Sequence, residues 1–314
     1  MFEIIQYTAE YKDTWNKFLE TSKNGTFMFD RNYMDYHADR FKDNSLMVFR
    51  KGCIYAVLPA NRDEDTLYSH QGLTYGGLIT NKKATTSEIL EVFELLKDFL
   101  SAQGIKHVIY KPIPHIYHNI PAEEDLYALF RCTNARIIAR NISSTIRQDN
   151  KIKFTESRKS GIRKAQRNGL VVTESTDLES FWEILSCNLK NKYDKKPVHT
   201  LEEIKMLTQV FPNNIKLYLT KDADNKPLGG TLIYITNSQT IHTQYISASQ
   251  KGKDIGALDI LFDHLINVEY KNYPIFDFGH STEEMGTILN NALIFQKEGF
   301  GGRGVLYDTY QFDL

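Results

Sequence analysis

The sequence has no long hydrophobic run: nowhere does it reach the roughly 18 consecutive apolar residues that a membrane-spanning helix requires. Cysteine is scarce too, and the three thiols, Cys53, Cys132 and Cys187, are odd in number and lack metal-ligand spacing. This pattern argues against a disulfide framework and indicates reduced core thiols. No cysteine stands in a nucleophile motif, and no residues show the spacing of a metal site.

Net charge is nearly absent, because 38 basic side chains are balanced by 39 acidic ones. The chain as a whole therefore has no field that would draw it onto nucleic acid or an anionic membrane, and any polyanion site must be local. The N-terminal residues MFEIIQYTAEYKDTW include early acidic side chains and no apolar run of signal-peptide length. We therefore expect a cytoplasmic protein.

What is present is the composition of a globular protein, with 41% hydrophobic and 25% charged residues. At 314 residues the chain is longer than one hydrophobic core usually organises, so its length favours two domains.

The first half has a definite order of elements. Apolar periodicity predicts helices at residues 12–21, 31–41 and 87–102, and strands at residues 46–50, 54–61, 67–79 and 107–111. Lys51 and Gly52 mark a tight hairpin between the first two strands, and Gly104 closes the third helix.

The second half repeats this order, with helices expected at residues 177–188, 200–211 and 255–270 and strands at residues 216–220, 228–236, 240–248 and 275–278. Thr200 and Glu203 have the spacing of a capping box. We therefore predict an α/β (α+β) protein of two tandem domains, residues 1–150 and 151–314. Each domain should hold a twisted, mostly antiparallel sheet flanked by helices. A single mixed α/β domain is the alternative.

Basic residues concentrate between the halves, in the segment KIKFTESRKSGIRKAQRNG at residues 151–169. It reads as a helix over residues 156–168 that ends at a Gly169 cap. Lys159, Arg163 and Arg167 recur every four residues and form one stripe, flanked by Arg158 and Lys164. Guanidinium forks suit phosphate recognition, but a solvated linker helix would explain the same charges.

A second candidate phosphate site is the turn between an expected strand and helix at residues 250–257, QKGKDIGA. Glycines permit close backbone approach there, and amides at a helix start can hold a pyrophosphate. The expected cofactor-binding residues are Lys251, Gly252, Lys253, Ile255, Gly256 and Ala257. The comparable junction in the first half, Tyr75-Gly76-Gly77, has no basic residue.

Several runs together resemble the FemAB-like acyltransferases, a branch of the GCN5-related N-acyltransferase (GNAT) superfamily. The specific parts are the basic helix SRKSGIRKAQRNGLVV and the ending FQKEGFGGRGVLYDTYQFDL; supporting runs are PLGGTLIY, HTQYISAS and FDFGHSTEEMG. The resemblance is clearest from about residue 140 onward, and the first half joins it through its element order and the run LTYGGLI.

The resemblance implies two tandem GNAT domains that act on an amine acceptor, without a metal. Some members of the family transfer amino acids from aminoacyl-tRNA to cell-wall precursors, and relatives in polysaccharide settings use acyl-CoA. The second half lacks the long helical arm of the cell-wall enzymes, which favours acyl-CoA, with acetyl-CoA first, over tRNA. Asp254 stands where the phosphate loop of GNAT proteins usually has a glycine.

The mechanism implied is direct attack of an amine on a bound thioester, with a protein base and backbone N–H groups that stabilise the oxyanion. Asp277, His280 and Glu283 cluster at the C-terminal end of the last expected core strand, and His242 lies on the strand before it. These four are the candidate catalytic residues, although Asp277 could cap a helix and His242 could be a core histidine. Arg158, Lys159, Arg163, Arg167 and Tyr75 are the candidate substrate-binding residues.

The leading hypothesis is an N-acyltransferase that moves an acyl group from acyl-CoA to an amine of a sugar-nucleotide or cell-envelope precursor. The alternatives are transfer from aminoacyl-tRNA and a degenerate GNAT module that only binds a ligand, which Asp254 and the plain first-half junction favour. Neither a DNA partner nor a particular oligomeric state is indicated.

Overall fold

The computed structural model describes residues 1–314, except for the side chain of Tyr193. Contacts divide the chain into two compact units. Unit 1 comprises residues 1–142, 282–289 and 305–314, and unit 2 comprises residues 143–281 and 290–304. The division therefore interleaves the chain, where the sequence suggested a single cut after residue 150.

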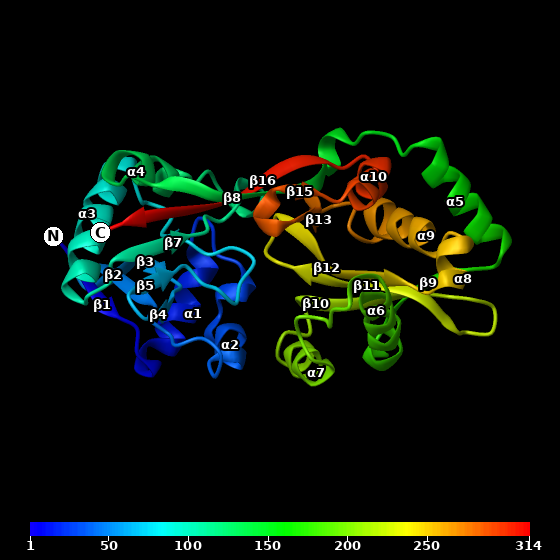
Figure 1. Cartoon of the computed structure of the whole chain (residues 1–314), viewed down its shortest axis with the longest axis horizontal. Helices are drawn as coiled ribbons and strands as arrows, with labels where there is room; N and C mark the ends of the chain where they lie inside the picture. Colours follow the sequence, from blue (N-terminus) through cyan, green and yellow to red (C-terminus); the bar gives the residue numbers. More distant parts are fainter. The chain divides into compact units, whose positions relative to one another are not determined.

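Unit 1 is built around two groups of strands, visible with its helices in Figure 1. One sheet has the order β1-β2-β3-β6 and is antiparallel throughout; the other group has the order β4-β5-β7-β16-β8. The strands are β1 (Phe2–Gln6), β2 (Leu46–Arg50), β3 (Cys53–Leu58), β4 (Asn61–Asp63), β5 (Thr66–Tyr68), β6 (Ile79–Thr80), β7 (His107–Tyr110), β8 (Arg136–Arg147) and β16 (Arg303–Asp313). The helices are α1 (Lys12–Thr21), α2 (Arg31–Met34), α3 (Thr86–Ala102) and α4 (Glu124–Cys132).

The apolar face of α3 forms much of the core of unit 1. Ile89, Val92, Phe93, Leu96 and Leu100 recur at helical spacing and are all buried. The helix ends before Gly104, whose φ of +76° is the left-handed conformation that glycine adopts without strain. Lys51 and Gly52 both have positive φ, as a tight turn between β2 and β3 requires.

Two expectations for unit 1 are wrong. Residues 67–79 do not form one strand, because the chain leaves β5 after Tyr68 and enters β6 only at Ile79. A side chain on Gly76 would lie 1.6 Å from the carbonyl oxygen of Ser69, so glycine is needed for this close turn. The helix expected at residues 31–41 is only α2 (Arg31–Met34), followed by a 3-10 turn, η3 (Asp35–His37).

Unit 2 contains a six-stranded arrangement in the order β8-β13-β12-β11-β10-β9. All neighbouring strands are antiparallel except β12 and β13, which run parallel. Helices α6 and α7 lie on one face of this sheet, and α9 lies on the other, with α5 packed on its outer side (Figure 1). The mostly antiparallel α/β architecture predicted from the sequence is confirmed.

The bounds in unit 2 follow. The strands are β9 (Val171–Ser175), β10 (Ile215–Lys221), β11 (Pro227–Ile235), β12 (Thr240–Ala248) and β13 (Ile275–His280). The helices are α5 (Glu156–Arg167), α6 (Leu178–Tyr193), α7 (Leu201–Val210), α8 (Gln250–Asp254), α9 (Ala257–His264), the π-helical turn η6 (Leu265–Glu269) and α10 (Asn291–Gly299). The capping box of Thr200 and Glu203 is present at the start of α7. The helix expected at residues 255–270 begins later, at Ala257, because Gly256 before it takes a left-handed φ of +83°, and it continues from α9 into η6.

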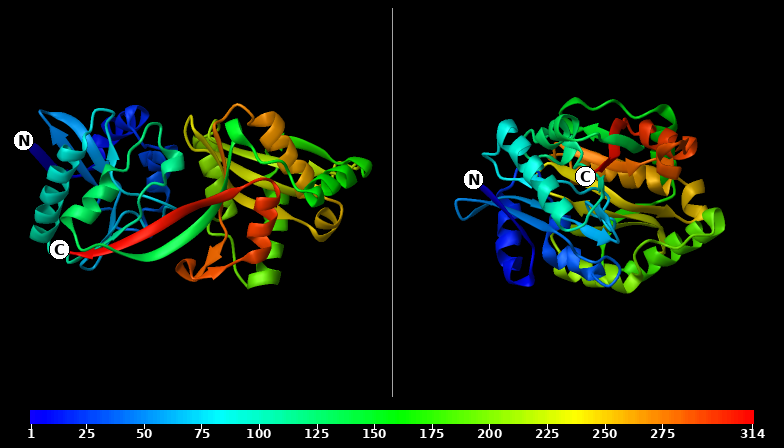
Figure 2. Two further views of the ribbon diagram at one scale, coloured as in Figure 1. Left: turned by 90° about the horizontal axis from the view of Figure 1, so that it is seen from above. Right: turned by 60° about the vertical axis from the view of Figure 1, so that its left-hand side comes forward.

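The sequence reading did not find the two longest strands, β8 and β16. They lie side by side in both views of Figure 2 and are neighbours in the hydrogen-bonded strand order. A short hairpin, β14 (Thr282–Glu283) and β15 (Ile288–Leu289), precedes α10 and belongs to unit 1.

Helix α5 is held against α9 by two glycines and an ion pair. A side chain on Gly161 would meet the Asp259 carboxylate at 2.2 Å, and one on Gly256 would meet the carbonyl oxygen of Gly161 at 2.4 Å. Arg158 donates to Asp259 across the same crossing at 2.7 Å. The two helices can therefore approach this closely only because both positions lack a side chain.

Gly161→Val should accordingly lower the melting temperature by several degrees, since the valine must push α5 away from α9. Ser160→Val is the matched control, because Ser160 is the exposed neighbour in the same helix and its replacement is nearly neutral in helix propensity, whereas valine in place of Gly161 gains propensity and so cannot by itself lower the melting temperature. Thermal unfolding followed by circular dichroism compares the two variants. Equal melting temperatures would show that the glycine contact contributes nothing.

Candidate functional site

Strands β12 and β13 part in the middle of unit 2. Their parallel pairing comprises Thr240 to His242 on β12 and ends at the pair of His242 and Asp277. Among the described residues, the rest of β12, from Thr243 to Ala248, has no strand partner on that side. One extra residue, Gln244, bulges from β12 opposite Leu232 and Ile233. A parted strand with a bulge turns backbone N–H groups away from the ladder, as an oxyanion site requires.

A histidine and a carboxylate meet at the parting point. The His242 Nδ1 atom lies 2.8 Å from Asp277 Oδ2, and both side chains are buried. Because a carboxylate accepts, Nδ1 carries the proton in this hydrogen bond and Nε2 is left as the basic nitrogen of the neutral ring. The structure therefore brings together two of the four catalytic candidates in an arrangement that can accept a proton.

Asp277 is surrounded by donors from three neighbouring segments. Its Oδ1 accepts from the hydroxyls of Ser143 and Thr145 on β8, and its Oδ2 accepts from His242 and from the backbone N–H of Gly279. Burial alone would raise the pKa of this carboxyl, but the hydrogen bonds and charge of His242, with the two hydroxyls, hold it well below its usual range. Asp277 is thus ionised at any working pH.

Lys297 is a functional candidate that the sequence reading missed. Its ammonium is buried, at 4% exposure, and donates to the backbone carbonyl oxygens of Gly279 (2.8 Å) and His280 (2.9 Å). Burial lowers the pKa of Lys297 to about 8. The signal in the sequence is the ending FQKEGFGG, one of the runs that carry the family resemblance, which contains Lys297.

The other two catalytic candidates are not among the hydrogen-bond partners of Asp277 described above. His280 ends β13, and its ring is exposed, although neighbouring protein atoms and then the Lys297 and His242 charges lower its pKa. Glu283 is exposed on β14, in the hairpin that belongs to unit 1. Asp277 thus hydrogen-bonds with His242, with Lys297 beside the strand end. His280 interacts with this pair through its charge, Glu283 lies in the hairpin, and catalytic roles for the four candidates stay predictions.

A large cavity of about 810 Å³ borders the parted strand. Its walls come from the end of β12, from α6, and from α8, α9 and α10. They are mostly apolar, and Gln250 and Lys253 of the predicted phosphate turn are among the polar residues in the lining. We call this space the donor pocket. Its lining includes the end of β12, the strand that carries His242.

In the predicted phosphate turn, two backbone amides and both lysine side chains already have partners within the protein. The Gly252 N–H donates to the Ser249 hydroxyl and the Lys253 N–H donates to the Ser249 carbonyl oxygen, so both are used within α8. Lys251 pairs with Asp222 at 2.9 Å, and Lys253 donates to Asn188. Gly256 and Ala257 begin α9 against α5, and Ala257 is buried. Pyrophosphate binding at this turn stays a prediction.

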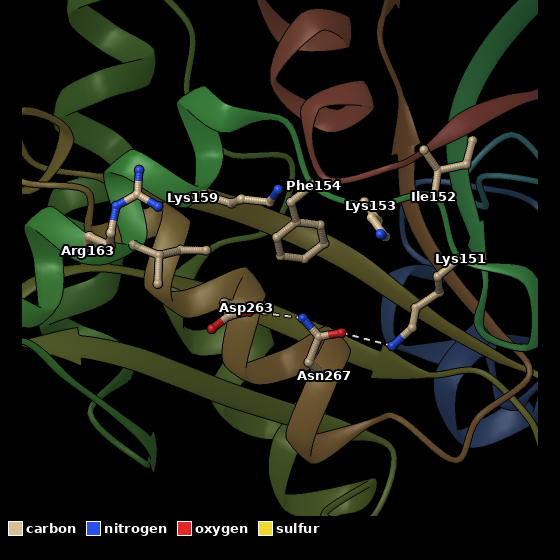
Figure 3. A pocket seen from close by; sticks show the side chains of 9 residues that line it. Lys151, Ile152, Lys153, Phe154, Lys159, Arg163, Asp263 and Asn267 are labelled. Carbon is tan, nitrogen blue, oxygen red and sulfur yellow. Dashed lines mark hydrogen bonds between the residues drawn. The ribbon is translucent and has the colours of Figure 1, made fainter.

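The predicted substrate-binding residues do not lie together at one site. Lys159 and Arg163 line a hollow of about 540 Å³ beside α9, shown in Figure 3, whereas Arg167 does not line it and Arg158 is paired with Asp259. Tyr75 is a residue of unit 1, where it is 2% exposed and packs against Tyr117 with ring centroids 4.5 Å apart. The side chain of Tyr75 therefore serves the core of that unit.

Two further searches concern the described residues. None of their helices combines the length and apolar character that crossing a bilayer requires. No group of three or more described His, Cys, Asp or Glu side chains is placed to hold a metal ion.

No protein-family model matches the chain, and no curated protein matches its sequence. Solved structures match its fold. FemX has a TM-score of 0.69 at 12% identity, with 99% of this chain and 97% of that chain covered. L-PGS from Bacillus licheniformis has a TM-score of 0.59 at 12% identity, covering 98% and 92%. A tandem GNAT protein from the clavulanic acid biosynthesis pathway has a TM-score of 0.52 at 8% identity, covering 100% and 98%.

These likenesses show the fold. The chain has the FemAB-like GNAT fold, as the sequence resemblance predicted.

The donors around Asp277 predict that Asp277→Asn lowers the free energy of unfolding by roughly 2 kcal/mol or more, because an amide cannot accept from all of them. Glu283→Gln is the control, since that side chain is exposed and should change stability by less than about 0.5 kcal/mol. Urea unfolding of both variants measures the difference. An Asp277→Asn variant as stable as the control would contradict the described arrangement.

Proposed function

We propose that the chain transfers an acyl group from acyl-CoA to a primary amine of a sugar-nucleotide or cell-envelope precursor. The observation that carries the proposal is the His242–Asp277 pair at the point where β12 leaves β13, on the strand whose other end lines the donor pocket. A GNAT-like acyltransferase fold supports it.

The chemistry needs one base. The amine nitrogen attacks the thioester carbonyl carbon, a C–N bond forms, and the carbonyl electrons move onto oxygen. His242 Nε2 takes the proton that the nitrogen must lose, while Asp277 stabilises the imidazolium. The C–S bond then breaks, the carbonyl reforms, and the proton passes from His242 to the departing thiolate.

The oxyanion needs donors at the same place. Lys297 uses two of its N–H bonds on the carbonyl oxygens of Gly279 and His280, which fixes the ammonium close to the end of β13. The third N–H bond, with the N–H groups on the parted edge of β12, supplies hydrogen bonds to the developing negative charge. At neutral pH Lys297 is protonated, because its pKa of about 8 lies above 7.

The donor pocket suits a thioester chain. Its volume of about 810 Å³ lies within the range of small-ligand sites, and its apolar walls suit a pantetheine-like arm. Gln250 and Lys253 provide polar contacts within the lining. Because the Gly252 and Lys253 amides are bonded to Ser249, the side chains of Gln250 and Lys253 rather than these two amides would contact the diphosphate.

A second candidate is transfer from aminoacyl-tRNA. The Gly252 amide of the predicted phosphate turn is bonded to Ser249, which favours this donor because aminoacyl-tRNA does not require a pyrophosphate site at α8. The likeness to FemX also supports it, through the aminoacyl-transferring members of the family. A binding module without catalysis is the third possibility. The buried, hydrogen-bonded pair of His242 and Asp277 counts against it, because a buried carboxylate is costly to retain without a role.

Lys297 makes the transfer rate depend on pH. The rate should fall as pH rises through about 8, because the ammonium loses its proton there and no longer neutralises the oxyanion. Lys297→Arg should keep its charge and move the alkaline fall to higher pH, whereas Lys297→Met should lose about 100-fold in kcat at pH 7. Rates of acetyl transfer to a model amine between pH 6 and 10 test this. An unchanged alkaline fall in Lys297→Met would assign it to another group.

The donor assignment predicts that Leu293→Trp weakens acetyl-CoA binding by about tenfold or more, because the indole fills the donor pocket that Leu293 lines. Phe295→Trp is the matched control on the same helix, since Phe295 is 65% exposed and does not line the pocket. Calorimetric titration with acetyl-CoA, a longer acyl-CoA and aminoacyl-tRNA makes the comparison. Binding of aminoacyl-tRNA alone would establish the second candidate, and binding of none would favour the module.

A further inference from the structure

A basic hollow in unit 2 is not used by the proposed reaction. It lies between the segment that leads into α5, the first turns of α5, and the end of α9 with η6 (Figure 3). Its volume is about 540 Å³, and it shares no lining residue with the donor pocket. The lining consists of Lys151, Ile152, Lys153, Phe154, Lys159, Ile162, Arg163, Asp263 and Asn267.

The charge around the hollow is strongly one-sided. Residues 151–167 carry seven basic side chains and one acidic one, Glu156, in a chain whose net charge is −1. Glu156 serves two of the cations, lying 2.8 Å from Lys159 and 3.9 Å from Arg163, and it is exposed. Four basic side chains thus line the hollow, and the carboxylates near them are too few to balance their positive charge. This excess favours an anionic ligand.

The one carboxylate of the lining, Asp263, accepts a hydrogen bond from a neighbouring side chain. Asp263 accepts from the Asn267 amide at 2.9 Å, and Asn267 in turn accepts from Lys151 at 2.8 Å, as Figure 3 shows. This chain of hydrogen bonds fixes Lys151 on the α9 side of the hollow. An anion would therefore be repelled from Asp263 and drawn to the α5 side, where Lys159 and Arg163 lie with Lys153.

The hollow also has an apolar part. The half-buried Phe154 ring lies in its lining and packs edge-on against Phe300, with centroids 5.3 Å apart, which fixes its orientation. Ile152 and Ile162 lie beside it in the lining. A fixed aromatic ring next to lysine and arginine side chains suits a ligand with a flat ring and phosphate groups.

We propose that this hollow binds a small nucleotide, with its phosphates on Lys153, Lys159 and Arg163 and its base against Phe154. The volume lies within the range of small-ligand sites, and the nearly neutral chain lacks the extended basic surface that a polynucleotide needs. The inference stands apart from the proposed reaction, because the two sites have separate linings.

Calorimetric titration of the full chain with ADP, UDP, adenosine and inorganic pyrophosphate tests the site. ADP or UDP should bind, and adenosine should bind at least about tenfold more weakly, because it lacks the phosphates. Arg163→Ala should weaken ADP binding by about tenfold or more. Arg167→Ala is the matched control, since Arg167 is exposed on the same helix and does not line the hollow, and it should bind ADP as the wild type does.

A second variant separates nucleotide from phosphate recognition. Phe154→Leu should weaken ADP binding about tenfold and leave pyrophosphate binding unchanged, which at the same time shows that the hollow is still folded. The proposal is overturned if neither ADP nor UDP binds, or if Arg167→Ala weakens ADP as much as Arg163→Ala. Binding of a short single-stranded RNA in the absence of mononucleotide binding would likewise overturn it.

Discussion

The buried carboxylate of Asp277 is the interaction on which the organisation of unit 2 depends. An ionised carboxylate removed from water costs several kcal/mol unless it is well hydrogen-bonded. Here it is offset by hydroxyls of β8, a histidine of β12 and the backbone of β13. These three strands must therefore keep their register, and the same requirement places His242 where β12 and β13 begin to part.

The parting of the strands and the position of Lys297 are connected. Because β13 is no longer paired with β12 after Asp277, the carbonyl oxygens of Gly279 and His280 need another donor. Lys297 supplies it from α10, which brings a buried cation next to the histidine and carboxylate pair. One irregularity of the sheet thus gathers the histidine, the carboxylate and the buried cation on which the proposed acyl transfer depends.

A different device shapes the outer face of α9. The crossing of α5 and α9 at Gly161 and Gly256 holds the basic helix close to the protein, and the Arg158–Asp259 ion pair fixes its direction. Lys159 and Arg163 are consequently turned to a hollow rather than spread over a solvated face, as a free linker helix would spread them.

Much of the fold could be predicted from local signals. The bounds of β2, β12 and α1, the capping box at Thr200 and the caps at Gly104 and Gly169 depend on residues adjacent in sequence, and they were predicted closely. Strands β8 and β16 were missed because neither shows a clean alternation of apolar and polar residues, and because their partners lie far away in the sequence. When the partner of a strand lies more than a hundred residues away, the residues of the strand itself do not indicate which segment it pairs with.

The residues of the candidate site likewise differ in whether the sequence alone could predict them. His242 and Asp277 were predicted as candidates because one lies on an expected strand and the other near the end of the next, and the parallel pairing of these strands brings them level. Lys297 was not found, since its task is to satisfy two carbonyl oxygens that only the parted strand exposes. Glu283 was grouped with Asp277 through nearness in sequence, but the bulge after Asp277 and the hairpin that follows lead the chain away.

The central claim is that His242 accepts the proton of the attacking amine, and chemical rescue tests it most directly. The measurement is the transfer rate of His242→Ala with and without added imidazole, at a pH where imidazole is largely neutral. The account predicts a loss of about 100-fold or more that imidazole partly restores in a concentration-dependent way. Transfer at the wild-type rate in His242→Ala, with no response to imidazole, would contradict it.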